Sequence, residues 1–253
     1  MTGFQAIILG LVQGLTEFLP VSSSGHLVIF QNLFGIDEPT ITFDIFLHLS
    51  TLAAILVFLR KRIIKIRFET LFLVAVGTVP AIILGLLLND YLELLFSSSK
   101  LVGITLLVTA AINFASDKLL NREGQKREID ELSWKNALVI GTFQALAITP
   151  GISRSGSTLL GGLWQKLKKE DAFEFSFLLA IPAILGATLL QIIKIITDNN
   201  IDIDPTNFFL GGITAFLSGL ASLIVFRIII AKAKLDVFAI YCLIVGALTL
   251  IFL

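Results

Sequence analysis

The chain has 253 residues, 56% of them hydrophobic, and a mean hydropathy of +0.93. This apolar share exceeds the ~45–50% of soluble domains and excludes an ordinary water-soluble fold. Basic and acidic residues number nineteen each, so the net charge of zero identifies no partner. The single cysteine, Cys242, excludes a disulfide framework or a thiolate metal site within the chain. We therefore interpret the chain as an integral, multi-pass membrane protein.

Ten apolar segments follow one another along the chain, and their lengths divide them into two kinds. A helix needs about 20 residues to cross a ~30 Å hydrocarbon core, whereas 15 residues cover only about 22 Å. In chain order they are two short segments (3–18 and 24–34), three long ones (41–60, 69–89 and 99–117), two short ones (134–147 and 155–165) and three long ones (172–197, 206–231 and 236–253). The sequence thus predicts an all-α fold with six spanning helices.

The short segments come in two adjacent pairs, each joined by a loop rich in proline, serine and glycine. We interpret each pair as a re-entrant helix–loop–helix hairpin that enters the membrane and returns to the same side. Non-helical backbone at membrane depth is tolerated only where it is buried in protein or lines a wet cavity. Both loops are therefore expected in a site. No lysine or arginine precedes Arg60, so we expect segment 3–18 to be part of the mature protein rather than a signal peptide.

The two loops carry related motifs. The first is Gln13-Gly-Leu-Thr-Glu-Phe-Leu-Pro-Val-Ser-Ser-Ser-Gly-His26, and the second runs from Gln144 to Thr158 as Gln-Ala-Leu-Ala-Ile-Thr-Pro-Gly-Ile-Ser-Arg-Ser-Gly-Ser-Thr. A glycine lies three residues before each motif, and the spacing from Gly10 to Gly25 equals that from Gly141 to Gly156, with an offset of about 131 residues. We predict one membrane domain, 1–253, made of two inverted-topology repeats, 1–117 and 134–253, joined by a cytoplasmic linker, 118–133.

The charges of the loops predict the orientation of the chain. Four loops are basic, at 60–67, 118–135, 166–169 and 227–234, whereas the alternate loops at 37–38, 89–93 and 198–204 are acidic. Basic loops favour the cytoplasmic side. Placing all four there puts both termini outside, with the first hairpin entering from outside and the second from inside.

Glu17 is the foremost candidate for chemistry. It ends an apolar segment at membrane depth, where a charge costs at least ~2.5–3.5 kcal/mol and therefore indicates function. Gln13 lies four residues earlier, on the same helix face. A carboxylate and an amide oxygen on one face suit a hard divalent cation, Mg²⁺ or Ca²⁺.

Arg154 is the expected counter-charge of Glu17. It lies in a loop of small residues that begins a helix, where backbone N–H groups, hydroxyls and a guanidinium together make an anion site, most naturally for phosphate. The serine run of the first motif offers the same groups, and two facing cradles suit a diphosphate. The predicted phosphate-binding residues are Ser22, Ser24, Gly25, Ser153, Ser155, Gly156 and Thr158.

The chain has two histidines, His26 and His48. His26 follows the serine run and is expected to reach Ser23 or a bound phosphate as general base, general acid or nucleophile. His48 is spaced four residues from Asp44 in a predicted spanning helix. We expect it to line the cavity or to form a hydrogen bond there.

Residues 13–26 and the sequence Pro-Gly-Ile-Ser-Arg-Ser-Gly-Ser-Thr at 150–158 resemble the two signatures of the undecaprenyl-diphosphate phosphatase family of the bacitracin-resistance type. The resemblance covers the whole chain in length, motif spacing and hydrophobic layout. The family's E/Q-x-x-x-E element begins here with Gln13, so Glu17 is the main expected metal ligand.

The resemblance implies hydrolysis of undecaprenyl diphosphate to undecaprenyl phosphate, which is reused as a cell-wall lipid carrier. It also implies a bacterial cell membrane location and an outward-facing active site. The expected partners are a polyprenyl diphosphate lipid and the bilayer. A homo-oligomer stays open, and no nucleic acid is expected.

For the mechanism, we expect Arg154 and both loops to neutralise phosphoryl charge while Glu17, helped by Gln13, positions the divalent ion. Ser23 attacks the terminal phosphorus with His26 as base. In the competing version His26 activates water or attacks directly, and Ser23 only binds. The rival function is a secondary transporter or flippase of an anionic polyprenyl lipid, because inverted repeats around a charged site also describe transporters.

Overall fold

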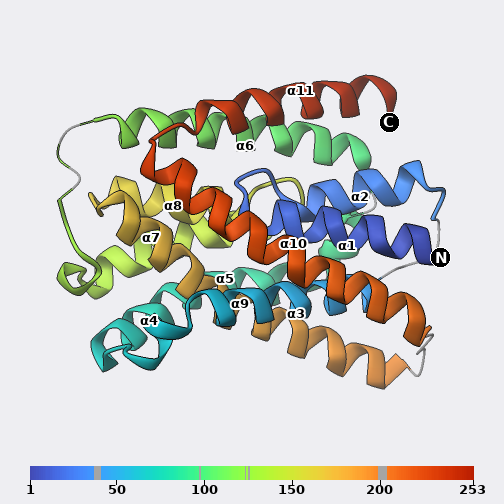
Figure 1. Cartoon of the computed structure of the whole chain (residues 1–253), viewed down its shortest axis with the longest axis horizontal. Coiled ribbons are helices and arrows are strands. Elements are labelled where there is room, and N and C mark those ends of the chain that lie inside the picture. The colour runs from blue at the N-terminus through green and yellow to red at the C-terminus, as the bar shows by residue number, and fades with distance from the viewer. Residues whose placement is uncertain (37–40, 97, 123, 125, 199–203) are drawn as a thin grey trace.

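The computed structural model describes residues 1–36, 41–96, 98–122, 124, 126–198 and 204–253. These residues form eleven α-helices and one 3-10 helix, and the described part of the chain contains no β-strand (Figure 1). The helices are α1 (Gly3–Phe18), α2 (Ser23–Leu33), α3 (Ile41–Phe58), α4 (Arg60–Ile64), α5 (Phe68–Phe96), α6 (Ser99–Leu120), η1 (Ile129–Glu131), α7 (Trp134–Leu146), α8 (Arg154–Trp164), α9 (Lys169–Asp198), α10 (Pro205–Ala231) and α11 (Asp236–Phe252).

Each of the ten apolar segments predicted from the sequence is a helix, with boundaries close to the predicted ones except in α5. The predicted loop at 89–93 is wrong, because α5 continues through it to Phe96. The short helix α4 in the first basic loop was not predicted. The acidic segments at 37–38 and 199–203 lie outside the described residues.

Within the described ranges, four helices are long and apolar enough to cross a membrane, namely α5, α6, α9 and α10. The other two predicted spans, α3 and α11, are also apolar but have only 18 and 17 residues. The four short helices have 11 to 16 residues, fewer than a full crossing needs. The architecture is that of an all-α, multi-pass membrane protein.

Two helical hairpins meet inside the molecule. α1 and α2 extend towards the end that carries both termini, and α7 and α8 towards the opposite end (Figure 1). The loops of the hairpins touch, since a Cβ atom on Gly25 would come within 3.0 Å of the Gly151 Cα atom. The two motifs therefore come together although they are far apart in the sequence.

Paired glycines allow two close helix crossings. A Cβ atom on Gly10 of α1 would lie 2.3 Å from the carbonyl oxygen of Gly211 in α10, and one on Gly141 of α7 would lie 2.2 Å from that of Gly77 in α5. Without side chains the backbones approach directly, as small residues allow in membrane helices. Gly10 and Gly141 each lie three residues before a motif. The helix that leads into each motif therefore crosses a long helix of the other half of the chain in the same way.

The four basic segments gather at the end of the molecule opposite the termini, where α4 lies in Figure 1. Three contacts join them to one another: Arg67 with Asp130, Lys168 with Glu128, and Lys169 with the carbonyl oxygen of Ala231. Positive charge is thus concentrated at one end of the helix bundle.

An aromatic cluster fixes the end of α1. The Phe177 ring of α9 packs edge-to-face against Phe18 at a centroid distance of 5.6 Å, against Phe173 at 4.7 Å and against Phe226 at 6.2 Å. Phe18 and Phe177 are fully buried. Such rings contribute large apolar area and a defined geometry. The residue that precedes Phe18, Glu17, is therefore held in a fixed place.

Candidate active site

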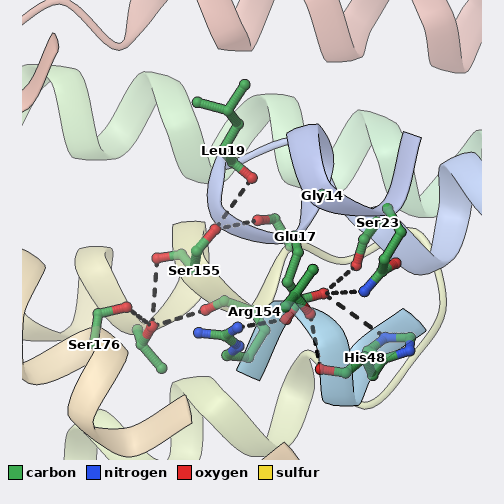
Figure 2. A network of polar contacts seen from close by, with 12 residues as sticks. Gly14, Glu17, Leu19, Ser23, His48, Arg154, Ser155 and Ser176 are labelled. Carbon is green, nitrogen blue, oxygen red and sulfur yellow. Dashed lines mark hydrogen bonds and ion pairs between the residues drawn. The ribbon is translucent and has the colours of Figure 1, made fainter. Parts of the chain in front are cut away.

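Glu17 is the centre of a buried polar network and is only 8% exposed. Arg154 Nη2 donates to Glu17 Oε1 at 2.6 Å, and Ser23 Oγ donates to Glu17 Oε2 at 2.6 Å (Figure 2). A buried carboxylate is tolerated only when it is paired and hydrogen-bonded, and these two groups provide both. The predicted pairing of Glu17 with Arg154 is present, and it joins the two motifs into one site.

Ser23 and Arg154 occupy equivalent places in the two motifs. Each is the first residue of its helix, Ser23 of α2 and Arg154 of α8, and each follows a serine cap, Ser22 or Ser153. The Glu17 carboxylate therefore bonds to the first side chain of each of two helices. The positive ends of helix dipoles and their free N–H groups favour anions, which suits a phosphate-binding site.

Two buried polar atoms of the site have no hydrogen-bond partner among the described residues. Gln13 Nε2 donates to Glu17 Oε2 at 3.1 Å, but Gln13 Oε1 is unpartnered there, and so is Arg154 Nη1. Buried polar groups in proteins are nearly always bonded, so water or a ligand is expected to meet these two atoms. The acceptor suits a cation and the donor suits an anion.

His48 of α3 also faces the carboxylate. Its Nε2 atom lies 3.7 Å from Glu17 Oε2 (Figure 2). Its Nδ1 atom donates to the Asp44 carbonyl at 2.8 Å. The spacing of Asp44 and His48 indicated an interaction, but the partner is the Asp44 backbone, and the Asp44 carboxylate accepts from Gln31. That His48 adjoins Glu17 could not be seen in the sequence, because α3 meets α1 only through tertiary packing.

The structure does not bring His26 to the Ser23 hydroxyl. His26 Nδ1 lies 2.7 Å from the Ser22 carbonyl and Nε2 lies 2.8 Å from the Tyr241 hydroxyl. Both ring nitrogens are therefore occupied, while the Ser23 hydroxyl donates to Glu17. The expected Ser23–His26 pair of nucleophile and base is absent from this geometry, and Glu17 takes the place next to the hydroxyl.

The predicted hydroxyl groups of the second loop form hydrogen bonds within the protein. Ser153 caps α8 and Ser155 bonds to the Leu19 carbonyl at 3.2 Å, which ties the second loop to the first. Thr158 Oγ1 donates to the Arg154 carbonyl and lies 2.5 Å from Ser176 Oγ. All three predicted residues are at most 1% exposed. They build the loop rather than line an open cradle.

Most of the remaining predicted phosphate-binding residues are also buried. Ser22 is buried as the cap of α2, whereas Ser24 is partly exposed. The two glycines are buried where the loops touch: a Cβ atom on Gly25 would meet Gly151, and one on Gly156 would lie 3.2 Å from the Pro20 ring. Of the predicted hydroxyls, only Ser24 reaches partly exposed surface.

A row of polar residues on α6 holds both loops, and the sequence analysis missed it. The row bonds to loop carbonyls over 2.6–2.7 Å: Thr105 to Pro150, Thr109 to Gly151, and Asn113 to Pro20. A spacing of four residues places these side chains on one face of the helix. Polar residues at this spacing in the apolar segment 99–117 were the signal that could have revealed it.

Comparisons with known proteins cover nearly the whole chain. The chain matches the family described as bacitracin resistance protein BacA over residues 6–248. The Undecaprenyl-diphosphatase of Thermosipho africanus (strain TCF52B) is 44% identical over 250 residues, which cover 95% of this chain and 96% of the relative. The Undecaprenyl-diphosphatase of Halothermothrix orenii (strain H 168) is 42% identical over 255 residues, 98% of this chain and 97% of the relative. Both motifs lie within these matches, and the chain belongs to the bacitracin resistance protein BacA family.

Proposed function

We propose that this protein is an undecaprenyl-diphosphate phosphatase. It removes the terminal phosphate of undecaprenyl diphosphate and returns undecaprenyl phosphate for use as a lipid carrier in cell-wall synthesis. The observation that carries the proposal is the buried Glu17 carboxylate held by Ser23 of one motif and Arg154 of the other. The shared name of relatives above 40% identity supports the substrate. Fold alone would not identify it.

Arg154 binds the diphosphate in this proposal. Its Nη2 atom is held by Glu17, while the unpartnered Nη1 atom remains to donate to a phosphoryl oxygen. The guanidinium also lies 5.9 Å from the centre of the Phe177 ring, an apolar surface that keeps water from that side. A preorganised donor in such surroundings stabilises charge as it develops on the transferred phosphoryl group.

Ser23 is the nucleophile and Glu17 its base. As Ser23 Oγ bonds to the terminal phosphorus, its proton passes to Glu17 Oε2, 2.6 Å away, and the bond from that phosphorus to the bridging oxygen breaks. Undecaprenyl phosphate leaves. Water then hydrolyses the phosphoserine, which restores the Ser23 hydroxyl and releases phosphate.

His48 exchanges the proton that Glu17 receives. Its Nδ1 atom donates to a carbonyl, so the Nε2 atom that faces Glu17 can accept a proton. The His48 side chain is 31% exposed, against 6% for that of Glu17. It can therefore pass the proton from the buried carboxylate to solvent.

We also propose that a divalent cation, Mg²⁺ or Ca²⁺, binds together with the substrate. Glu17 and the unpartnered Gln13 Oε1 atom are oxygen donors of the kind these ions prefer. No group of three or more His, Cys, Asp or Glu suited to a metal occurs among the described residues, so phosphate and water oxygens would have to supply the remaining ligands of such an ion. Such an ion would neutralise phosphate charge.

Replacing Gln13 with glutamate tests the cation proposal. The change Gln13→Glu adds a carboxylate beside Glu17, so the Mg²⁺ concentration for half-maximal phosphate release should fall about tenfold, equivalent to about 1.4 kcal/mol. Gln13→Ala should raise it. Titration of Mg²⁺ into metal-free protein measures both, and an unchanged midpoint in both variants would rule out Gln13 as a ligand.

We also propose how the helices are arranged in the membrane. In this arrangement α3, α5, α6, α9, α10 and α11 cross the bilayer, and the hairpins α1–α2 and α7–α8 re-enter from opposite sides. The gathering of the basic segments at one end supports a cytoplasmic location for that end, with both termini and the mouth of the active site outside.

The two inverted repeats, 1–117 and 134–253 with the linker 118–133, are likewise part of the proposal. Their support is the matching pair of glycine crossings, Gly10 with Gly211 and Gly141 with Gly77. Inverted repeats commonly place a site at their interface. The contact between the two motif loops is such a place.

The test is the fate of undecaprenyl diphosphate mixed with purified protein in detergent and Mg²⁺. We expect undecaprenyl phosphate and phosphate in equal amounts, measured by mass spectrometry and by phosphate assay, and Glu17→Gln should abolish both. Absence of both products from folded protein, with transport of the intact lipid in vesicles, would contradict the proposal and favour a flippase.

A further inference from the structure

Ser22, the residue before Ser23, has a backbone conformation that is unusual for a residue with a side chain. Its φ is 71° and its ψ is 101°. Two further non-glycine residues of the described ranges have a positive φ, Lys166 and Ala233, and both follow a helix C-terminus, where this conformation is common. Ser22 precedes a helix instead. A positive φ there is strained and needs surroundings that hold it.

The second motif shows that capping a helix does not require this strain. Ser153 corresponds to Ser22 and caps α8 through the same hydrogen bond, yet its φ is −72° and its ψ is 119°. The strained backbone is therefore particular to the motif that carries Ser23.

His26 holds the strained residue in place. The Ser22 carbonyl accepts two bonds from His26, one from the backbone N–H at 3.3 Å and one from Nδ1 at 2.7 Å. The second motif has Ser157 at this position, and its hydroxyl has no partner within the described ranges. The side-chain clamp is thus present in the strained motif and absent from the relaxed one.

The Ser22 carbonyl determines which nitrogen of His26 carries the proton, and Tyr241 supports that form. A carbonyl can only accept, so Nδ1 must be protonated, and in the neutral ring Nε2 is then an acceptor. The Tyr241 hydroxyl of α11 lies 2.8 Å from Nε2 and donates to it. This bond stabilises the Nδ1–H form and occupies the lone pair that a general base would use.

We propose that His26 and Tyr241 are positioning residues, which hold the strained Ser22 backbone so that the Ser23 hydroxyl stays on Glu17. This rests on the proposed hydrolysis at Ser23. It replaces a proton-transfer role for His26 by a mechanical one, and it adds a residue of α11 that lies in neither motif.

Isosteric variants of His26 separate the two roles. Asparagine places an amide N–H where Nδ1 lies, whereas glutamine places it nearer to Nε2. His26→Asn should keep kcat within about tenfold of wild type, while His26→Gln and His26→Ala should lose about a hundredfold, the usual effect of displacing a reacting group by about 1 Å. KM should change little, because Arg154 still binds the phosphate.

Tyr241→Phe removes one hydroxyl and should lower kcat about three- to tenfold, the effect of one hydrogen bond. The matched control is Tyr91→Phe. Tyr91 is the other tyrosine of the chain and is 62% exposed on α5, so its variant should behave as wild type. Equal losses in His26→Asn and His26→Gln, with full activity of Tyr241→Phe, would overturn the proposal in favour of a base.

Glycine adopts a positive φ without strain, so it provides a rescue. In the His26→Ala background, Ser22→Gly should recover at least about tenfold of the lost kcat, since the backbone no longer needs the clamp. No rescue in a folded double variant would contradict the mechanical role. Each variant is compared with wild type for thermal unfolding, so that loss of fold is not read as loss of positioning.

Nitrogen-15 NMR of histidine-labelled protein tests the arrangement without activity. The variant His48→Gln leaves His26 as the single histidine. We expect a neutral ring protonated at Nδ1, and a weakened preference for this form in Tyr241→Phe. A ring protonated at Nε2 would overturn the inference. If the wild-type protein released no phosphate, the proposed hydrolysis would be wrong. The spectrum would still show whether His26 makes the proposed contacts with Ser22 and Tyr241.

Discussion

Replacing Arg154 with alanine is expected to lower kcat for phosphate release about a thousandfold or more, as loss of a phosphate-stabilising arginine does in other phosphoryl transfers. The variant loses the donor proposed to bind phosphate and leaves the Glu17 carboxylate buried without its counter-charge. Breaking such a pair on one side should also lower the free energy of unfolding by about 3 kcal/mol. Phosphate release and thermal unfolding in detergent measure the two effects.

The chain offers controls for both effects. Arg62 pairs with Glu174 at the basic end of the molecule, so Arg62→Ala removes an arginine–glutamate pair outside the site and should leave kcat within about twofold. The double variant Glu17→Gln/Arg154→Gln removes both buried charges and should recover most of the stability but none of the activity. An Arg154→Ala enzyme with a tenth or more of wild-type kcat would contradict the role of Arg154.

Gly10→Ala and Gly141→Ala are expected to destabilise the helix bundle strongly. Each added methyl group would lie 2.3 or 2.2 Å from a carbonyl oxygen of the crossing helix, which cannot move unless the helices separate. Overpacking of this kind typically costs about 1–3 kcal/mol, and the rigid backbone contact places these two at about 3 kcal/mol. The midpoint of thermal unfolding should fall in both variants.

Gly186→Ala is the matched control, because a Cβ atom at Gly186 in α9 would meet no described atom within 4 Å apart from its chain neighbours and the nearby backbone of its own helix. An alanine there should leave stability unchanged or raise it by about 0.5–1 kcal/mol, since alanine favours a helix over glycine. Equal midpoints for all three variants would show that the glycine crossings do not determine the stability of the bundle.

The sequence predicted the helices well because lipid imposes a simple rule. A segment in hydrocarbon must satisfy its own backbone, so long apolar runs become helices and charged runs end them. The rule failed in α5, where residues 89–93 carry acidic groups and yet continue the helix to Phe96. A charge near the membrane boundary does not by itself end a helix.

The site was predicted in its charges but not in its hydrogen bonds. A buried glutamate needs a counter-charge, and Arg154 was the one arginine in a motif, so their pairing followed from electrostatics. A serine or histidine side chain can form hydrogen bonds with many different groups. Ser155 bonds to the Leu19 carbonyl, and His26 bonds to Ser22 and Tyr241. These partners depend on packing between segments far apart in the sequence.

The contacts of the site with residues of other helices could not be predicted from the sequence either. His48 reaches Glu17 because α3 packs beside α1, and Thr109 and Asn113 hold the loops because α6 packs behind them. Spacing predicts which residues share a face of one helix, but it does not predict which helix that face meets.

The most direct test of the central claim, that two motifs form one hydrolytic site, is a double-mutant cycle of Ser23→Ala and Arg154→Ala. Residues that act together in one step give non-additive losses. We therefore expect the folded double variant to release phosphate no more slowly than the less active of the two single variants. Losses that multiply, or a Ser23→Ala enzyme that releases phosphate as fast as wild type, would contradict the account.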